Sequence, residues 1–413
     1  MRMLHTSDWH LGRTLHGVDL LGHQAAYLDH LVELVRAESV ETVVVAGDVY
    51  DRAVPPVEAV GLLADALRRL SETAAVVVTP GNHDSAIRLG FGAELMRPGV
   101  HLRARVADVG VPVVLRDEHG PVAVHALPYL DPDAARSVLA DDGEPLARSH
   151  EAVVGAAMAR VRRELVMRGA ASGASERVRA VVLAHAFVVG GQGSESERDI
   201  RVGGVDAVPA GVFAGVDYVA LGHLHGPQEI AFPAGAAAVP DGEGSGGSPP
   251  AVSGPAPVLR YSGSPLAYSF SELRHRKSSV LVELGRDGVV GTTLVPAPVP
   301  RRLAEVTGTL GELLGAAGDG HEDDWLRAVV TDPVRPPELH ARLKSRFPHL
   351  LVTEHRPPAG TARTRAAVVT AAQDPVDVAA QFVEHVTGAA PSADELAVLR
   401  AAYEQVLAAE RSA

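Results

Sequence analysis

Short apolar segments that end abruptly in polar side chains are the feature of this sequence that most restricts its fold. Residues 76–86 read VVVTPGNHDSA, so three valines are soon followed by an amide, an imidazole and a carboxylate. The segments ETVVVAGDVYD, RAVVLAHAF and DYVALGHLHG have the same form, which is typical of buried strands followed by turns. Amphipathic stretches at residues 23–38 and 55–72 predict helices, the second with Pro55 or Pro56 at its first position. Strands that alternate with helices indicate an α/β layered domain.

The length of the chain predicts more than one domain. A chain of 413 residues is too long for one ordinary hydrophobic core, and the character of the sequence changes near residue 285. We predict a first domain over residues 1–285, a smaller α+β domain over 286–372 and a helical segment over 373–413. In the α+β domain, WLRAVVTD and LLVTEHRP predict strands on either side of a helix in PPELHARLKSRF. The Gly/Ser/Pro-rich segment 235–257 is interpreted as a surface loop.

The C-terminal segment contains signals for two helices. Asp374 and Pro375 are suited to begin the first and Gly388 to end it, and Ser392 with Glu395 forms a capping box for the second. The second helix has an apolar face, which either packs against its own domain or docks a partner, and the residues alone favour neither interpretation. The members of this face are Leu396, Leu399, Tyr403, Val406 and Leu407.

Composition excludes several classes of protein. The chain contains no cysteine, so disulfides, thiolate zinc sites, iron–sulfur clusters and thiol nucleophiles are excluded. The start has no apolar signal-peptide region and no run of apolar residues is long enough for a transmembrane helix, so we expect a cytoplasmic protein without membrane attachment. The formal net charge of −13 argues against a basic sheath that grips nucleic acid. Nucleic acid is not excluded, because bound cations or a basic partner could supply the positive charge.

Potential metal ligands follow the apolar runs in five separate segments. In open α/β sheets, the loops that leave the carboxyl ends of neighbouring strands converge, so residues far apart in sequence can share one site. Within SDWH and GHLH, the residues at i and i+2 can point to the same side. The candidates are Asp8 and His10 in SDWH, Asp48 in GDVYD, Asn82, His83 and Asp84 in GNHD, His185 in AHAF, and His223 and His225 in GHLH.

Taken singly, these residues have ordinary structural explanations. Asp48 alone is more often a helix cap or turn residue, and His185 alone is more often a hydrogen-bonded core histidine. Together they would be costly to bury without compensation, and a metal offsets that cost. Oxygen and imidazole nitrogen suit manganese, iron or zinc, and the ligands are too numerous for one tetrahedral zinc. Two metal ions about 3.5–4 Å apart would use them all, and such a pair hydrolyses phosphate esters.

The order and context of these motifs resemble the calcineurin-like metallophosphoesterases. The closer resemblance is to the SbcD family, the nuclease subunits of SbcCD complexes. It rests on HTSDWHLGR, GDVYDRAVPP, SERDIRVGG, ALGHLHGPQ and YSGSPLAYSFSE, and it resumes at DPVDVAAQFVEHVTG in the tail. The segment 235–257 is an insertion relative to this family, and AHAF is a slightly unusual form of its fourth motif. The resemblance implies a four-layer αββα phosphoesterase domain followed by a DNA-capping domain.

The resemblance also implies roles for individual residues. His83 would donate a proton to the leaving oxygen or stabilise the transition state, and Asp84 would orient it. Asp51 and Arg52 are given a structural role in the turn. Two divalent metal ions, with Mn²⁺ favoured, would be bound, and Asp48 would bridge them. One ion would be held by Asp8, His10, Asp48 and His225, and the other by Asp48, Asn82, His185 and His223.

The function implied by the family is manganese-dependent cleavage of DNA. It comprises exonuclease action on duplex ends and endonuclease action on hairpins or single strands, in DNA repair, recombination and replication. The expected partners are DNA, an SbcC-like ABC-type ATPase docked on the tail, and a second copy of the chain in a homodimer. This sequence has no phosphate-binding loop of its own, so any ATP dependence would come from the partner. The alternatives are a phosphomonoesterase or cyclic-nucleotide phosphodiesterase with the same metal pair, and a scaffold that binds metal without catalysis.

Basic residues and histidines outside the motifs are assigned structural roles. Arg274, Arg276 and Lys277 form the strongest basic cluster, for which a solvated turn is a better interpretation than phosphate binding. His5 and His275 are interpreted as surface or core histidines.

Overall fold

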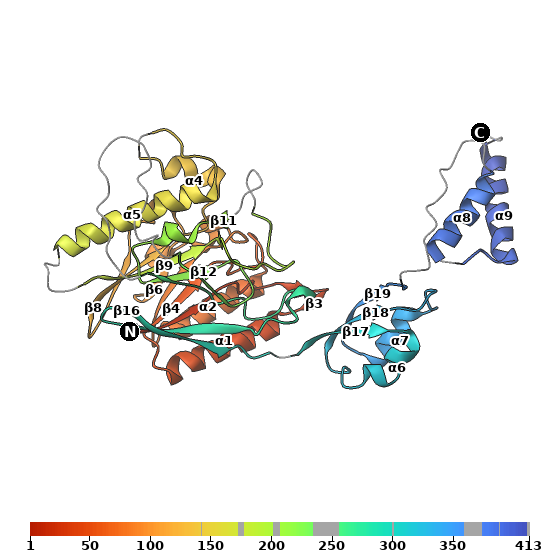
Figure 1. Ribbon diagram of the computed structural model, residues 1–413, viewed down its shortest axis with the longest axis horizontal. Coiled ribbons are helices and arrows are strands. Elements are labelled where there is room, and N and C mark those ends of the chain that lie inside the picture. The colour runs from red at the N-terminus through yellow and green to blue at the C-terminus, as the bar shows by residue number, and fades with distance from the viewer. Residues whose placement is uncertain are drawn as a thin grey trace. The chain divides into compact units, whose positions relative to one another are not determined.

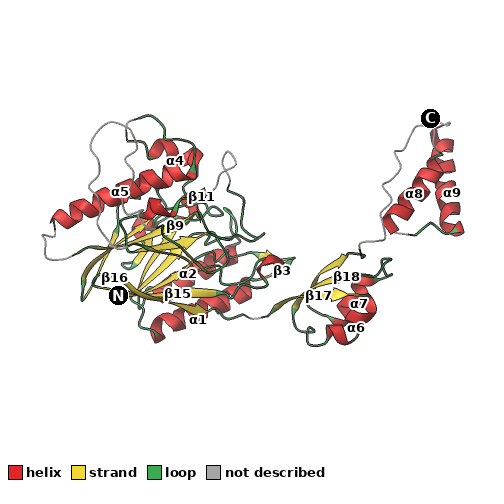
Figure 2. Ribbon diagram, viewed as in Figure 1, coloured by secondary structure: helices red, strands yellow, loops and turns green. Residues whose placement is uncertain are grey.

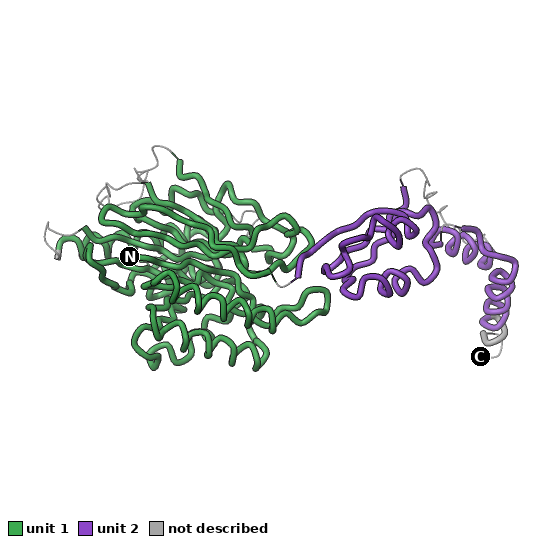
Figure 3. The backbone as a smooth tube through the Cα atoms, turned by 90° about the horizontal axis from the view of Figure 1, so that it is seen from below, with its two compact units in different colours: residues 1–300 green, residues 301–413 purple. Residues whose placement is uncertain are grey.

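The computed structural model describes residues 1–141, 143–171, 177–200, 207–233, 256–299, 301–358, 374–387 and 389–410. The chain divides into two compact units, residues 1–300 and 301–413 (Figure 3). Nearly all of the Gly/Ser/Pro-rich segment 235–257 lies outside the described residues. The domain limits at 285/286 and 372/373 remain predictions. The strand Gly288–Pro296, beyond the first predicted limit, still belongs to the first sheet of unit 1.

The first sheet of unit 1 has the strand order β16-β15-β1-β4-β5-β6. Its strands β1, β4, β5 and β6 run parallel, and the β15–β16 hairpin extends the sheet antiparallel to β1. The strand bounds are β1 Arg2–Thr6, β4 Thr42–Ala46, β5 Ala75–Thr79, β6 Val100–Leu102, β15 Ser278–Gly285 and β16 Gly288–Pro296.

The second sheet of unit 1 has the order β13-β14-β12-β9-β8-β7. Strands β8, β9, β12 and β14 are parallel, with antiparallel strands at both edges. The bounds are β7 Val113–Asp117, β8 Gly120–Ala126, β9 Arg179–His185, β12 Tyr218–Gly222, β13 Gln228–Ile230 and β14 Val258–Tyr261. Two small ribbons pair β2 Thr14–Leu15 with β3 Val18–Asp19, and β10 Phe187–Val188 with β11 Ala207–Val208.

Helices cover the outer face of each sheet, so unit 1 has the αββα layers (Figures 1 and 2). In Figure 1, α4 and α5 lie above the strands and α1 lies below them. The helix bounds are α1 Leu21–Ala37, α2 Val57–Leu70, the short α3 Ala86–Leu89, α4 Pro132–Val138 and α5 His150–Ala171. Short 3-10 turns occupy Ala93–Leu95, Val106–Asp108, Ala210–Phe213 and Phe270–Glu272.

The alternation of side chains along each strand builds this layering. In β4, Val43 and Val45 pack with α1 and α2, whereas Val44 and Ala46 face the core between the two sheets. Because both faces of the strand are covered, the sequence is continuously apolar instead of alternating with polar residues. The α/β class and the four-layer arrangement predicted from the sequence are confirmed.

Helix α2 begins one residue later than the proline signal predicts. Pro56 occupies the N-cap position with φ −58° and ψ 149°, and Val57 is the first helical residue. The fixed φ of proline is compatible with either position, so the sequence locates this helix start only to within a residue.

Unit 2 contains a small parallel sheet and a separate pair of helices. Strands β17 Leu303–Gly308, β18 Trp325–Val330 and β19 Leu350–His355 are parallel and in that order, with α6 Leu310–Leu314 and α7 Leu339–Arg346 between them in the chain. The prediction of an α+β arrangement is wrong in this respect, because parallel neighbours joined through helices form βαβ units. The sequence located the elements of this sheet but did not reveal the strand directions.

The C-terminal helices α8 Pro375–Thr387 and α9 Ala393–Glu410 contact each other. Asp374 Oδ1 accepts a hydrogen bond from the Val376 amide at 2.8 Å, which confirms the predicted cap. Ser392 and Glu395 form the reciprocal bonds of the predicted capping box. Gly388 lies outside the described residues. Among the residues that are described, no helix is both long and apolar enough to cross a membrane.

His5 is a polar bridge between the two sheets. It is fully buried in β1, and its ring nitrogens lie 2.9 Å from the Tyr218 hydroxyl and 3.2 Å from the Leu221 carbonyl oxygen, both in β12. Burial lowers the pKa of His5 to about 3. The folded state therefore holds His5 neutral over a range in which the unfolded chain protonates it.

This difference predicts a loss of stability in mild acid. Between pH 6.5 and about 3 the unfolded state binds a proton at His5 that the folded state does not, so the free energy of unfolding falls as the pH falls. His5→Gln should reduce the pH slope of the unfolding free energy by up to one proton per molecule. Denaturant titrations of metal-free protein from pH 7 to pH 4.5 measure this slope, and an unchanged slope would contradict the assignment.

Candidate metal centre

The loops at the carboxyl ends of five parallel strands bring the predicted ligands together. Strands β1, β4 and β5 belong to the first sheet and β9 and β12 to the second, so both sheets contribute. All of these side chains except Asn82 and His83 are buried. Asp8 and His10 follow β1, Asp48 follows β4, Asn82 and His83 follow β5, His185 ends β9, and His223 and His225 follow β12.

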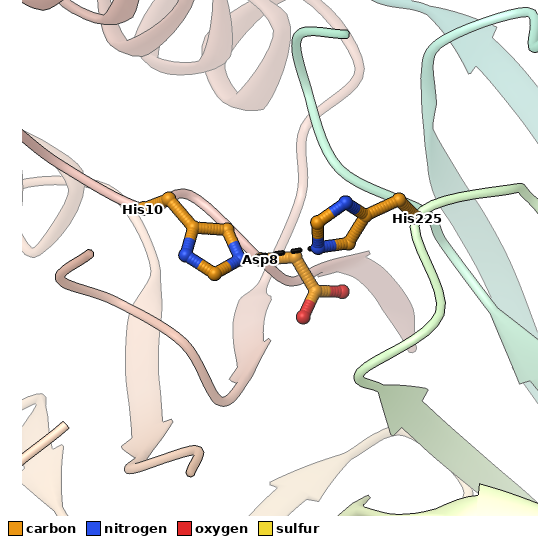
Figure 4. A group of neighbouring side chains, drawn as sticks. All are labelled: Asp8, His10 and His225. Atoms are coloured by element: carbon orange, nitrogen blue, oxygen red, sulfur yellow. Dashed lines mark hydrogen bonds between the residues drawn. The ribbon is translucent and has the colours of Figure 1, made fainter. Parts of the chain in front are cut away.

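Within the described part of the chain, three overlapping groups have the spacing of a metal site. They are Asp8–His10–His225, His10–Asp48–His83 and Asp8–Asp48–His185, and in each the ligand atoms lie within 4.8 Å of one another. Figure 4 shows the first group, in which the rings of His10 and His225 point at each other with their Nε2 atoms 3.1 Å apart. Asp48 Oδ2 lies 3.5 Å from His10 Nε2 and 3.4 Å from His185 Nε2. This carboxylate is therefore central to the cluster.

The remaining predicted ligands lie beside His185. Asn82 Oδ1 is 2.8 Å from His185 Nε2. His223 belongs to none of the three groups, but its ring centroid is 5.3 Å from that of His185, and its backbone amide donates to Asp8 Oδ1 at 2.9 Å. Each of the seven residues predicted to bind metal thus lies next to another of them.

The donor set fits divalent metal ions. Carboxylate, amide oxygen and imidazole nitrogen are ligands for hard or borderline cations. Three buried atoms in this cluster have no hydrogen-bond partner among the described residues, namely His10 Nδ1, His83 Nε2 and Asn82 Nδ2. Buried polar groups are rarely left unpaired. Water around a bound ion would pair with the Asn82 amide group and His83 Nε2, whereas His10 Nδ1 faces Asp51 on the other side of its ring, at 3.6 Å.

Burial and the charge of Asp48 together determine the protonation of the cluster. It raises the pKa of Asp8 to about 6 and lowers the pKa of His10 to about 3, because each charged form is disfavoured away from water. For His185 burial opposes protonation, but the Asp48 charge outweighs it and raises the pKa to about 9. The metal-free cluster thus keeps His10 in the neutral form that binds a metal ion and stores a proton on His185, which a metal ion would displace.

Strained backbone accompanies the ligands. Asp8, His10 and Asp48 have φ values of 54°, 45° and 48°, and His223 has 102°. Non-glycine residues in such conformations cost about 1–3 kcal/mol each and cluster at functional sites. Four neighbouring cases in one cluster support a functional reason for the geometry.

Glycines permit the close approach of the two sheets at this point. A Cβ on Gly222 would lie 1.7 Å from the Ala46 carbonyl oxygen, which belongs to the other sheet. Gly47, directly before Asp48, has φ +86°, and a Cβ there would lie 2.2 Å from His185 Nδ1. At Gly222 the structural requirement is space instead of an unusual φ.

The structure corrects the role predicted for Asp84. Its carboxylate accepts hydrogen bonds from the amides of Val49, Tyr50 and Gly81 at 3.0, 2.8 and 2.8 Å. His83 Nδ1 instead lies 2.7 Å from the backbone carbonyl of Asp51. Asp84 therefore holds the loops after β4 and β5 together, and a main-chain carbonyl orients His83. A sequence pattern does not reveal such a main-chain contact.

Sequence reasoning missed a group of residues behind the metal cluster. Lys277 was interpreted as part of a solvated turn, but it is buried and forms an ion pair with Glu272, which is also buried. Glu272 in turn lies 3.2 Å from His225 Nδ1. Arg274 and Arg276 are exposed, as the solvated turn predicts. The combination of Glu272 and Lys277 five residues apart gave no signal that distinguishes a buried pair from a surface pair.

The layered fold and the buried carboxylate–imidazole cluster together define a metal-dependent phosphoesterase. The calcineurin-like phosphoesterase family model matches residues 1–227, and the model described as the type 5 capsule protein repressor C-terminal domain matches residues 299–387. The chain is also 32% identical over 362 residues to the D subunit of the nuclease SbcCD from Bacillus subtilis (strain 168), covering 84% of both chains. It therefore belongs to the calcineurin-like phosphoesterases, in the branch of the SbcD nuclease subunits.

Solved structures with weaker similarity include TT1561 of Thermus thermophilus, which is 15% identical with a TM-score of 0.39 over 72% of this chain and 99% of that one. Another is GAP50, the anchor in the inner membrane complex of Plasmodium, which is 12% identical with a TM-score of 0.36 over 72% of this chain and 84% of that one.

The contact of Gly222 with Ala46 predicts that Gly222→Ala disrupts the metal cluster. The added methyl group must push β12 away from β4, so we expect a loss of about 3 kcal/mol in unfolding free energy and weaker Mn²⁺ binding. Gly61→Ala is the matched control, because Gly61 lies in α2 with open space around it and should gain up to about 1 kcal/mol. Calorimetric metal titration and denaturant unfolding check both variants. Wild-type metal binding in Gly222→Ala would contradict the prediction.

Proposed function

We propose that this chain is a metal-dependent DNA nuclease of the SbcD type, which hydrolyses phosphodiesters as a duplex exonuclease and as a hairpin or single-strand endonuclease. The observation that carries the proposal is the central position of Asp48, with His10 on one side and His185 on the other. This arrangement is suited to two adjacent cations with a shared carboxylate. Similarity to a nuclease subunit over most of the chain supports the choice of DNA as substrate.

The assignment of individual residues is part of the proposal. Asp8, His10, Asp48 and His225 would hold one metal ion, and Asp48, Asn82, His185 and His223 the other. Bound metal ions would polarise the scissile phosphate and supply a nucleophilic water. Mn²⁺ is the ion we favour from the resemblance to the SbcD family. The oxygen and imidazole ligands are compatible with it, as they are with iron or zinc.

His83 is the residue proposed to transfer a proton. Its Nδ1 faces the Asp51 carbonyl, which can only accept, so Nδ1 carries a hydrogen and Nε2 is the free position. To donate to the leaving oxygen, Nε2 must first take up a proton. Burial lowers the pKa of His83, while the charges of Asp48 and Asp51 act in the opposite direction. The negative charge of a phosphate group that enters the site would also raise the pKa of His83.

Two arginines beside the cluster are suited to bind the phosphate backbone. Arg198 donates to the Asn82 carbonyl at 3.1 Å and remains exposed. Arg13 donates to the Ser196 carbonyl at 3.0 Å, and its guanidinium lies over the ring of Tyr268. Local positive charge of this kind, together with bound cations, offsets the net charge of −13 when a polyanion approaches. The alternative function, cleavage of phosphomonoesters or cyclic nucleotides, would use the same metal ligands.

The proposed protein partners are an SbcC-like ATPase and a second copy of this chain. Phe382 and Val386 in α8 and Val398 and Val406 in α9 are large apolar side chains exposed to solvent, which supports docking of the ATPase on the tail. A separate group in unit 1 supports a homodimer. Ile87, Phe91 and Leu95 are spaced four residues apart and are 88%, 83% and 88% exposed.

The proton-transfer assignment predicts that His83→Ala abolishes DNA cleavage and keeps both metal ions. Loss of a general acid lowers the rate by about 10²–10⁴-fold. Cleavage of hairpin DNA with Mn²⁺ and the number of bound metal ions are measured on the same preparation. The cleavage of bis-p-nitrophenyl phosphate, a small phosphodiester, is measured for comparison. Normal cleavage by His83→Ala would refute the role, and loss of one metal ion would make His83 a ligand. Faster turnover of the small diester than of DNA by the wild type would favour the alternative function.

The docking assignment predicts that deletion of residues 391–413 weakens binding to the ATPase and spares Mn²⁺-dependent cleavage. The paired substitutions Val398→Asp and Val406→Asp should have the same effect, because they place charge in an apolar interface. Val290→Asp is the matched control, since Val290 is an exposed valine in β16 of unit 1. Co-purification with a tagged ATPase partner is the measurement. Unchanged recovery of the complex would show that the tail is not the docking site.

A further inference from the structure

We propose that Glu272 is a positioning residue for His225, and that Ser196 and Lys277 hold its carboxylate in place behind the metal centre. The inference rests on the metal centre proposed above and assigns a role to residues outside its ligand set. None of the three was predicted from the sequence to serve the site.

The two nitrogens of His225 face different surroundings. Nε2 points at the cluster, 3.1 Å from His10 Nε2. Nδ1 points away from it, 2.7 Å from Ser196 Oγ and 3.2 Å from Glu272 Oε1. The Ser196 hydroxyl donates to the same carboxylate oxygen. Both the Ser196 oxygen and the Glu272 carboxylate can therefore accept a hydrogen bond from His225 Nδ1. The hydrogen is thereby fixed on Nδ1, and the lone pair of Nε2 is left free for a metal ion.

The carboxylate is itself held from several directions. Glu272 has a fully buried side chain and pairs with the ammonium group of Lys277. The Tyr268 amide donates to Glu272 Oε1 at 3.2 Å. Lys277 also donates to the His225 carbonyl oxygen at 3.0 Å and to Ser264 Oγ at 2.9 Å. One lysine therefore fixes both the carboxylate that faces the ring and the main chain that carries it.

Stability alone does not explain such a pair. Removing two charges from water is unfavourable, and packed apolar residues of the same volume are often as stable or more stable. The ammonium group of Lys277 and the hydrogen bond from His225 both favour the ionised carboxylate of Glu272. The site keeps a full negative charge behind the imidazole, which makes Nε2 a stronger donor to a cation.

Other ligand histidines have weaker support. His185 Nδ1 is paired with the neutral carbonyl of Ala46 at 3.0 Å. His10 Nδ1 lies 3.6 Å from Asp51 Oδ1, which is too long for a hydrogen bond. Loss of Glu272 should therefore affect the metal position shared by Asp8, His10 and His225 more than the position beside His185.

The test uses the full chain and the double variant Glu272→Gln/Lys277→Met, which removes both charges together. We expect an apparent Mn²⁺ dissociation constant about 10- to 100-fold higher for one of two sites, measured by electron paramagnetic resonance of free Mn²⁺. The control is Asp117→Asn/Arg179→Met. It removes a buried ion pair at the start of β9, at the opposite end of that strand from His185 and about 20 Å from it. The control should lower the thermal midpoint without changing Mn²⁺ affinity.

Wild-type Mn²⁺ affinity at both sites of the Glu272→Gln/Lys277→Met variant would overturn the proposal. If that variant fails to fold, Glu272→Asp decides, because it keeps the charge beside Lys277 and withdraws the carboxylate from His225 Nδ1 by one methylene group. Several-fold weaker Mn²⁺ binding by Glu272→Asp supports the positioning role, and unchanged binding refutes it. The readout is independent of DNA cleavage. A wild-type chain that binds two Mn²⁺ ions but leaves DNA intact would refute the nuclease while leaving this inference standing.

Discussion

The rest of the site depends on one carboxylate, Asp48, lying between histidines that belong to different sheets. His10 follows a strand of the first sheet and His185 ends a strand of the second, and Asp48 Oδ2 is within 3.5 Å of a ring nitrogen of each. This contact requires the two sheets to meet at their carboxyl edges. The absence of a side chain at Gly222 allows that approach, since any Cβ there would collide with the Ala46 carbonyl. The geometry of the candidate ligands therefore depends directly on how closely the two sheets pack.

The sequence pattern was sufficient to predict an α/β layered domain and the polar residues at its strand ends, whereas the four-layer arrangement was implied by the family resemblance. Continuous apolar runs such as Thr42–Ala46 identify strands covered on both faces, and the polar residues that follow identify the edge where they end. Asp8, His10 and Asp48 could be placed together for that reason. The helix caps at Asp374 and Ser392 involve residues only two or three positions apart, so the sequence was sufficient to predict them as well.

What the sequence did not reveal depends on contacts between distant segments. The family resemblance suggested that Asp84 orients the ring of His83, but its oxygens accept hydrogen bonds from three backbone amides in neighbouring loops. Glu272 meets His225 across 47 positions of sequence. The parallel strands of unit 2 were missed for a similar reason, because strand direction is set by the pairing of β17, β18 and β19 and not by their composition.

Drawing ligands from both sheets has a consequence for how this protein matures. The strained φ angles at Asp8, His10, Asp48 and His223 and the buried charges oppose folding in the absence of metal. Binding of cations between the sheets would offset that cost only when both halves are correctly assembled, so metal uptake would select molecules with the correct tertiary structure. A polypeptide with a misaligned sheet would have no high-affinity cation site, and metal loading would thus distinguish finished molecules from misassembled ones.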